Sequence, residues 1–219
     1  MPSKIIFFAI LSFGISQTSL GQIPNKNLST NELWTGITLK YEVNKKNTIS
    51  LKQQFRTTDN LNEVRSNFFE IGFKHKLSKH ISTKVHFRHT ILNEQRNRNR
   101  YILDGTGEWK IKQTKVHIDY RLRMQESMVT YTGQPFTILR NKIQLHRKIS
   151  KHSNVLAAFE SFYQFNDVNN FNVTRYTLGF NYSIDKRMEL NSYLRLDQEI
   201  NVKKPKRQYI IGLLLSYKI

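Results

Sequence analysis

The sequence predicts an all-β fold, a single antiparallel β-barrel that spans a membrane. Three observations predict it: apolar and polar residues alternate along most of the chain, the alternating segments are long, and short and long polar connections take turns between them. Because a strand points successive side chains to opposite faces, this alternation gives the sheet one apolar and one polar face. Such a sheet suits a barrel with lipid outside and water inside.

The segment "KVHIDYRLRM" shows the alternation, which recurs all along the chain past Gln22. Helical spacing, with apolar residues every three or four positions, is hard to find there. A charged face on a helix would not alternate residue by residue, so the pattern predicts strands. The apolar members of the segment are Val116, Ile118, Tyr120, Leu122 and Met124.

The length of the segments favours a membrane barrel over a soluble sandwich. Soluble strands average about 5 to 6 residues, whereas a tilted membrane strand needs about 9 to 11. Most of the alternating segments fall at or above the longer figure. They are 33–43, 48–57, 67–77, 81–91, 100–111, 115–125, 136–149, 154–165, 172–183, 188–198 and 207–219.

The connections between the segments alternate in length. Outer-membrane barrels have short turns on the periplasmic rim and longer loops on the extracellular rim, and we expect the same here. The predicted tight turns are 44–47, 78–80, 112–114, 150–153 and 185–187, and the predicted loops are 58–66, 92–99, 126–135, 166–171 and 199–206.

We predict twelve strands, of which eleven are clearly patterned. If "NKKN" (44–47) is periplasmic, the first and last clear segments both run toward the periplasm, and an antiparallel barrel needs one more strand. Residues 22–32, "QIPNKNLSTNE", would supply it. Two alternatives are that these residues thread the lumen, or that eleven strands close through a parallel pair. Closure is required, since an open edge in lipid leaves backbone groups unpaired.

Residues 1–21 have the layout of a cleaved export signal, which leaves 22–219 as the barrel. Lys4 precedes the apolar "IIFFAILSFGI", and Ser19 and Gly21 stand where a signal peptidase cuts. The formal net charge of +19 would suit nucleic acid, but an exported chain meets anionic lipid instead. No cysteine is present and the histidines are scattered, so we expect no metal and no cofactor.

Aromatic residues of the apolar face sort to the ends of the strands, as in the girdles of membrane barrels. The final stretch, "QYIIGLLLSYKI", is read as the strand that closes the barrel. It resembles the signal read by barrel-assembly machinery, although it ends in Ile219 instead of an aromatic residue. The predicted girdle consists of Phe55, Phe69, Tyr101, Tyr163, Tyr176 and Tyr209 at the loop end, and Tyr41, Trp109, Tyr182 and Tyr217 at the turn end.

A family resemblance rests on three stretches that follow the export signal: "NELWTGITLKYEVNKKNTISLKQQFR", "RYTLGFNYSIDKRMELNSYLRLDQE" and "IIGLLLSYKI". Together they resemble an uncharacterised outer-membrane barrel family of Bacteroidota that bears only a domain-of-unknown-function label. The resemblance covers nearly all of the mature chain. It implies the barrel fold and an outer-membrane location, and it implies no activity and no functional residues.

The polar face of the predicted strands forms a charged lumen. One interpretation is a ladder of salt bridges between strands that seals a structural barrel. The other is a narrow transport-type pore in which Lys and Arg favour a small anionic solute. The predicted network consists of Lys40, Lys52, Arg56, Glu70, Lys74, Lys84, Arg88, Glu108, Asp119, Arg121, Arg123, Arg140, Lys142, Glu160, Arg175 and Arg195, with Glu42, Asp104, Glu189 and Asp197 as further acidic members.

Two other functions stay open. A lipid-modifying enzyme needs a nucleophile beside a base; "HIS" (80–82) has that spacing but lies at a turn, and we do not expect catalysis. A surface binding protein would act through the basic stretches 95–100 and 203–207, which suit lipopolysaccharide phosphates. Expected partners are therefore outer-membrane lipid, lipopolysaccharide, the assembly machinery and a small anion, not nucleic acid. Inward apolar residues, which suit either packing or an amphipathic ligand, are Trp34, Phe68, Phe162, Tyr193, Ile210 and Leu214.

Overall fold

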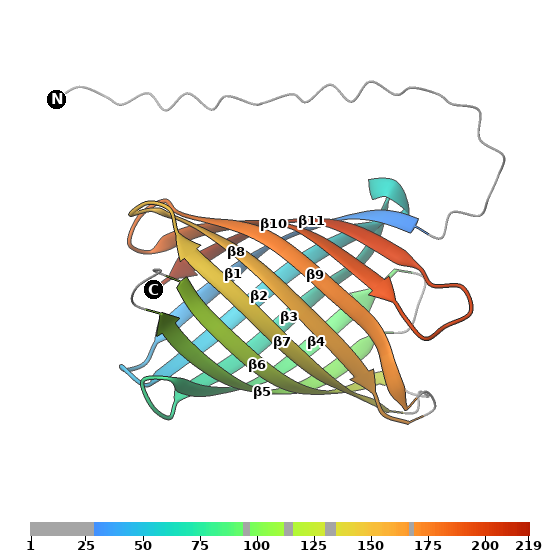
Figure 1. Cartoon of the computed structure of the whole chain (residues 1–219), viewed down its shortest axis with the longest axis horizontal. Helices are drawn as coiled ribbons and strands as arrows, with labels where there is room; N and C mark the ends of the chain where they lie inside the picture. The colour runs from blue at the N-terminus through green and yellow to red at the C-terminus, as the bar shows by residue number, and fades with distance from the viewer. Residues whose placement is uncertain (1–28, 94–96, 112–115, 130–134, 167–168) are drawn as a thin grey trace, which may run out of the picture.

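The strands of the chain close into one barrel (Figure 1). The computed structural model describes residues 29–93, 97–111, 116–129, 135–166 and 169–219. Strands that follow each other in the chain pair antiparallel, which confirms the predicted all-β barrel. The elements are β1 (Ser29–Glu42), β2 (Asn47–Thr58), the short helix η1 (Asp59–Leu61), β3 (Glu63–Lys76), β4 (Ile81–Leu92), β5 (Arg98–Ile111), β6 (Val116–Val129), β7 (Phe136–Lys148), β8 (Ser153–Gln164), β9 (Asn170–Ser183), β10 (Met188–Glu199) and β11 (Arg207–Lys218).

The predicted count of twelve strands is wrong, because eleven strands close the barrel. β1 begins at Ser29, so the polar residues 29–32 extend the first strand instead of belonging to an earlier one. β1 and β11 pair in parallel, from Ser29 with Arg207 to Lys40 with Lys218. With an odd number of hairpin-connected strands, the first and last run the same way and their pairing has to be parallel. Residues 1–28, which include the predicted export signal, lie outside the described residues.

Four tight turns at one rim share a side-chain cap. The side-chain oxygens of Asn44, Ser78, Ser150 and Asp185 each accept hydrogen bonds from the backbone N–H groups two and three residues later. Short polar side chains at turns satisfy backbone donors in this way, which explains why Asn, Ser or Asp starts each turn. We call this end the tight-turn rim and the opposite end, with η1 and residues 200–206, the loop rim. The predicted tight turns 44–47, 78–80, 150–153 and 185–187 lie at the tight-turn rim, and 112–114 lies outside the described residues. The connections at the loop rim are shorter than predicted, because β3 begins at Glu63, β5 begins at Arg98 and β6 runs to Val129.

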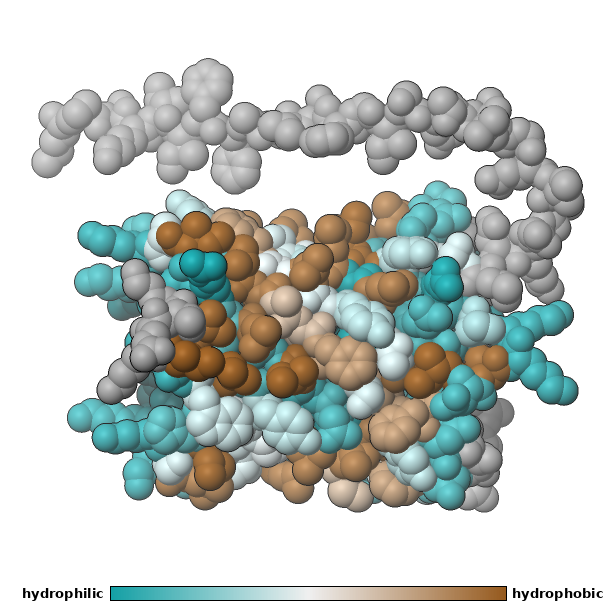
Figure 2. All heavy atoms as spheres, in the orientation of Figure 1, coloured by the Kyte–Doolittle hydropathy of each residue, from teal (hydrophilic) through white to brown (hydrophobic). Residues whose placement is uncertain are grey.

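The outer wall of the barrel is apolar and exposed. Leu51, Ile71 and Leu103 leave about half of their surface exposed, and Leu178 and Leu194 leave more than 60%. Figure 2 shows apolar residues over the middle of the barrel and hydrophilic residues at both ends. An exposed apolar surface of this extent marks contact with lipid or protein. Among the described residues, no helix is long and apolar enough to cross a membrane.

The predicted girdle residues lie on this outer wall. Most are exposed, and Tyr163 and Tyr217 are half-buried. The barrel's core lies in the lumen instead, toward the loop rim. Its most deeply buried side chains are Phe68, Ile210, Gln54, Glu32 and Ser127.

Candidate functional site in the lumen

A layer of arginine side chains crosses the middle of the lumen. The alternation that sends apolar residues to the outer wall sends these residues inward, so each strand from β2 to β10 contributes to this level of the lumen. Buried carboxylates lie among the arginines. We call this set the arginine layer; it consists of Arg56, Arg88, Arg123, Arg140, Arg175 and Arg195 with Glu70, Asp104, Glu160 and Asp197.

Aromatic rings stack against one side of the layer. The guanidinium carbon of Arg56 lies 3.9 Å from the centre of the Trp34 ring and 4.9 Å from that of Phe68. The guanidinium carbon of Arg88 also lies near the Phe68 ring, 4.1 Å from its centre. A desolvated guanidinium on an aromatic face gains about 2 kcal/mol or more, which helps to hold like charges together here.

The stacking continues across the lumen. Arg140 and Arg175 lie 4.3 and 4.9 Å from the Phe162 ring centre. Arg175, on β9, also reaches within 5.8 Å of the Trp34 ring on β1. The aromatic residues expected inside the barrel therefore pack against arginines, and the layer closes around the lumen.

Three of the four carboxylates of the layer, Glu70, Asp104 and Glu160, each contact more than one basic side chain, whereas Asp197 pairs with Arg175. Glu160 pairs with Arg121 at 2.7 Å, Arg140 at 2.9 Å and Arg175 at 3.6 Å. Its side chain is almost fully buried. A buried carboxylate needs close cationic partners and hydrogen bonds to offset its desolvation, and Glu160 accepts three hydrogen bonds from Arg121 and Arg140. Removing it would leave three cations without this partner.

His86 joins the two carboxylates on the other wall. Its Nδ1 lies 2.9 Å from Glu70 Oε1, and its Nε2 lies 3.0 Å from Asp104 Oδ2. Because ionised carboxylate oxygens only accept hydrogen bonds, this bridge suits an imidazole with protons on both nitrogens. Arg88 and Arg123 complete the coordination of these two carboxylates. The layer is thus a continuous ion-pair network from β3 to β6.

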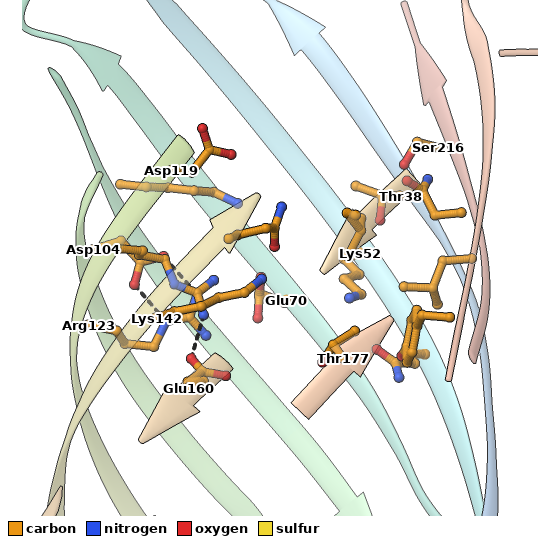
Figure 3. Close-up of a pocket in the computed structure, with 18 of the residues that line it drawn as sticks. Thr38, Lys52, Glu70, Asp104, Asp119, Arg123, Lys142, Glu160, Thr177 and Ser216 are labelled. Carbon is orange, nitrogen blue, oxygen red and sulfur yellow. Dashed lines mark hydrogen bonds and ion pairs between the residues drawn. The ribbon is translucent and has the colours of Figure 1, made fainter. Parts of the chain in front are cut away.

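On the side of the layer that faces the tight-turn rim lies a cavity of about 560 Å³. The layer forms its closed end, and residues such as Thr38, Lys40 and Ser216 line it near the tight-turn rim. Lys40 is exposed, whereas most of the layer is buried, so the cavity opens toward the tight-turn rim. Figure 3 shows Lys52 and Lys142 reaching into it from opposite sides.

Of the sixteen main residues of the predicted network, all but one line the cavity. Glu108 does not line it, but pairs with Lys74 at 3.6 Å and borders a separate groove at the tight turns. Among the further acidic members, Asp104 and Glu189 line the cavity, Glu42 instead pairs with Lys218 at 2.8 Å, and Asp197 pairs with Arg175 in the arginine layer.

The cavity wall is strongly basic. Twelve Lys and Arg and five Asp and Glu line it, an excess of seven positive charges. Like charges also face each other across neighbouring strands, which destabilises a sheet. A structural salt-bridge ladder would not need this excess. The facing pairs are Lys74 with Lys84, Arg88 with Arg100, Arg121 with Lys142, and Arg123 with Arg140.

Two contributors were absent from the predicted network. Glu32, 1% exposed, accepts a hydrogen bond from the Trp34 indole N–H at 2.7 Å and pairs with Arg65. Glu32 lies two residues before Trp34, so both side chains point to the same face of the strand. This could have been predicted, but residues 29–32 are all polar and were not recognised as part of the strand. His86 was the second absent contributor, because its bridging position between Glu70 and Asp104 depends on the folded register.

The described residues do not assemble a hydrolytic pair. The His80 ring contacts the backbone carbonyl of Glu108 at 3.0 Å, and within the described ranges no imidazole nitrogen hydrogen-bonds a serine or threonine hydroxyl. The stretch 95–100, predicted as a basic loop, is divided: Arg98 and Arg100 belong to β5, and 95–96 lie outside the described residues. Lys203 and Lys204 are exposed at the loop rim.

Comparison with known proteins gives a family and a distant structural likeness. No curated protein matches the chain. Of solved structures, "Outer-membrane expressed OmpT of Vibrio cholerae" is similar with a TM-score of 0.41 and 10% identity over 70% of this chain; the match spans about half (54%) of that protein. Residues 31–208 match the model of "Protein of unknown function (DUF2490)". The predicted domain-of-unknown-function family is confirmed, whereas an origin in Bacteroidota stays a prediction. The chain belongs to the DUF2490 family.

Proposed function

We propose that this protein is an outer-membrane barrel whose lumen binds small anions and passes them through a narrow constriction, the arginine layer. The observation that carries the proposal is the excess of seven positive charges on the cavity wall. Rings of Lys and Arg in a confined pore attract anions and repel cations. Both earlier interpretations of the lumen contribute: the salt-bridge network forms the constriction, and the basic cavity forms the entrance.

The exposed apolar wall supports a membrane location. Side chains such as Leu178 and Leu194 would face water in a soluble barrel, at a cost of roughly 25 cal/mol per Å² of apolar surface. The predicted export signal and the polar rims at both ends are consistent with an outer-membrane barrel. In this proposal the tight-turn rim faces the periplasm, so the cavity opens to the periplasm.

Planar-bilayer recording of the refolded barrel tests the proposal. Replacing Trp34, Phe68 and Phe162 with Ala removes the rings against which the layer packs and keeps every charge. We expect this triple variant to conduct more than the wild-type barrel, with a reversal potential near that of chloride in a KCl gradient. The matched control is Phe69→Ala, at the exposed neighbour of Phe68 on the outer wall. This variant barrel should conduct like wild type. Cation selectivity of the opened barrel would contradict the proposal.

A further inference from the structure

Three lysines of the cavity face carboxylates with which they form no ion pair. In the strand register each lies directly opposite an acidic residue on the next strand, where a cross-strand salt bridge is the ordinary expectation. In each case the carboxylate is bonded to other cations. The register pairs are Lys52 with Glu70, Lys84 with Asp104, and Lys142 with Glu160.

Arginine and histidine take the first two carboxylates. Glu70 Oε2 accepts a hydrogen bond from Arg88 Nε at 2.8 Å, and its other oxygen contacts His86. Asp104 receives Arg123 through two nitrogens at 2.6 and 2.7 Å, and also contacts His86. A guanidinium binds a carboxylate with two parallel hydrogen bonds, which a lysine ammonium cannot do.

The third carboxylate is bound by arginines alone. Glu160 pairs with Arg121, Arg140 and Arg175, from β6, β7 and β9. Lys142, its register partner on β7, is left out. Across the described part of the chain, none of the three lysines forms an ion pair with a carboxylate, and all three line the cavity.

The lysines surround the cavity from three sides. They come from β2, β4 and β7, and Lys52 and Lys142 project from opposite walls (Figure 3). Two of them also face another cation: Lys84 lies opposite Lys74, and Lys142 lies opposite Arg121. A bound anion would relieve this repulsion. A cavity of about 560 Å³ is of the size that holds a small solute.

We propose that Lys52, Lys84 and Lys142 form a binding site for a small solute that carries two or more oxyanion groups, of the diphosphate type. The inference rests on the proposed anion function and names the class of solute and the residues that hold it. Three separate ammonium groups favour a multivalent anion, because its second group binds without a further loss of translational freedom. A single chloride ion neutralises one ammonium group and leaves the other two without a partner.

Calorimetric titration of the full chain, refolded in detergent micelles, tests this site with inorganic pyrophosphate as the probe. We expect one pyrophosphate per barrel at low ionic strength, and much weaker binding of chloride. Each single Lys→Met change should weaken binding about tenfold, the loss of one charge-assisted hydrogen bond. The triple Lys→Met variant should lose measurable binding.

The matched control removes the same charge outside the cavity. Lys79, Lys151 and Lys186 are exposed at the tight turns, and their triple Lys→Met variant should keep the wild-type affinity. Heat-dependent gel mobility shows that each variant folds, and the single variants carry the test if a triple variant does not. Two results would overturn the site: no binding of pyrophosphate to the wild-type barrel, or equal losses in the lumen and control variants.

The titration and the conductance measurement fail separately. Anion-selective current without pyrophosphate binding would overturn the lysine site and leave the proposed function standing. Pyrophosphate binding to a barrel whose opened variant prefers cations would support the site and overturn the proposed passage of anions.

Discussion

Replacing Glu160 with Ala is expected to lower the free energy of unfolding by about 3 to 5 kcal/mol, the range for removing one partner of a buried ion pair. Glu160 is 2% exposed and pairs with Arg121, Arg140 and Arg175. Without it, three guanidinium groups repel one another around an empty site. Urea unfolding of the barrel in lipid, followed by tryptophan fluorescence, measures the change.

Glu189→Ala is the matched control for this prediction. Glu189 lines the same cavity, but within the described ranges it belongs to no ion pair. Its replacement should change the unfolding free energy by less than about 1 kcal/mol, as expected for a site outside a bonded network. Equal effects of the two replacements would show that the loss depends on charge alone and not on the arginine layer.

Gly36→Ala is expected to impair barrel closure. Gly36 lies on β1 between β2 and β11, beside the parallel seam. A Cβ atom at this position would collide with the backbone carbonyl oxygen of Gln53 and would lie 2.9 Å from the Cα atom of Gln54. Backbone atoms in a paired strand cannot move aside as a side chain can, so we expect a loss of about 1 to 3 kcal/mol or more.

Gly105→Ala provides the comparison, since a Cβ atom there meets nothing within 4 Å. Both glycines lie within strands, where Ala is favoured over Gly by roughly 0.5 to 1 kcal/mol. Gly105→Ala should therefore fold as well as wild type or better, while Gly36→Ala gives a smaller heat-resistant fraction on gels. If both variants fold equally well, the close approach of β1 to β2 is not a constraint on closure.

The strands were predictable because a period of two is a local property. A segment such as 115–125 shows its inward and outward faces without reference to the rest of the chain. The strand count failed where that signal ends: residues 29–32 are polar on both faces, so they did not resemble part of a membrane strand. In the structure these four residues lengthen β1 beyond the apolar wall, toward the loop rim.

The lumen was predictable as a set of residues but not as a set of partners. Register places Lys142 opposite Glu160, and a cross-strand rule would pair them. The arginines of neighbouring strands are long and planar, and they bind the carboxylate in preference to lysine. This competition depends on side-chain reach across several strands. Sequence alone therefore left both the sealed structural barrel and the anion pore compatible with the pattern.

Thiol labelling tests the arrangement of the barrel most directly, since the chain has no cysteine of its own. Three single-cysteine variants sample its three environments: Ser216→Cys in the cavity, Leu213→Cys on the exposed outer wall, and Ser127→Cys, which is 0% exposed beyond the layer. In proteoliposomes, a membrane-impermeant anionic thiol reagent should modify Ser216→Cys and spare the other two. Rapid modification of Leu213→Cys would show that the outer wall meets water, and rapid modification of Ser127→Cys would show that the lumen is wide open at this level instead of constricted to the size of a small anion.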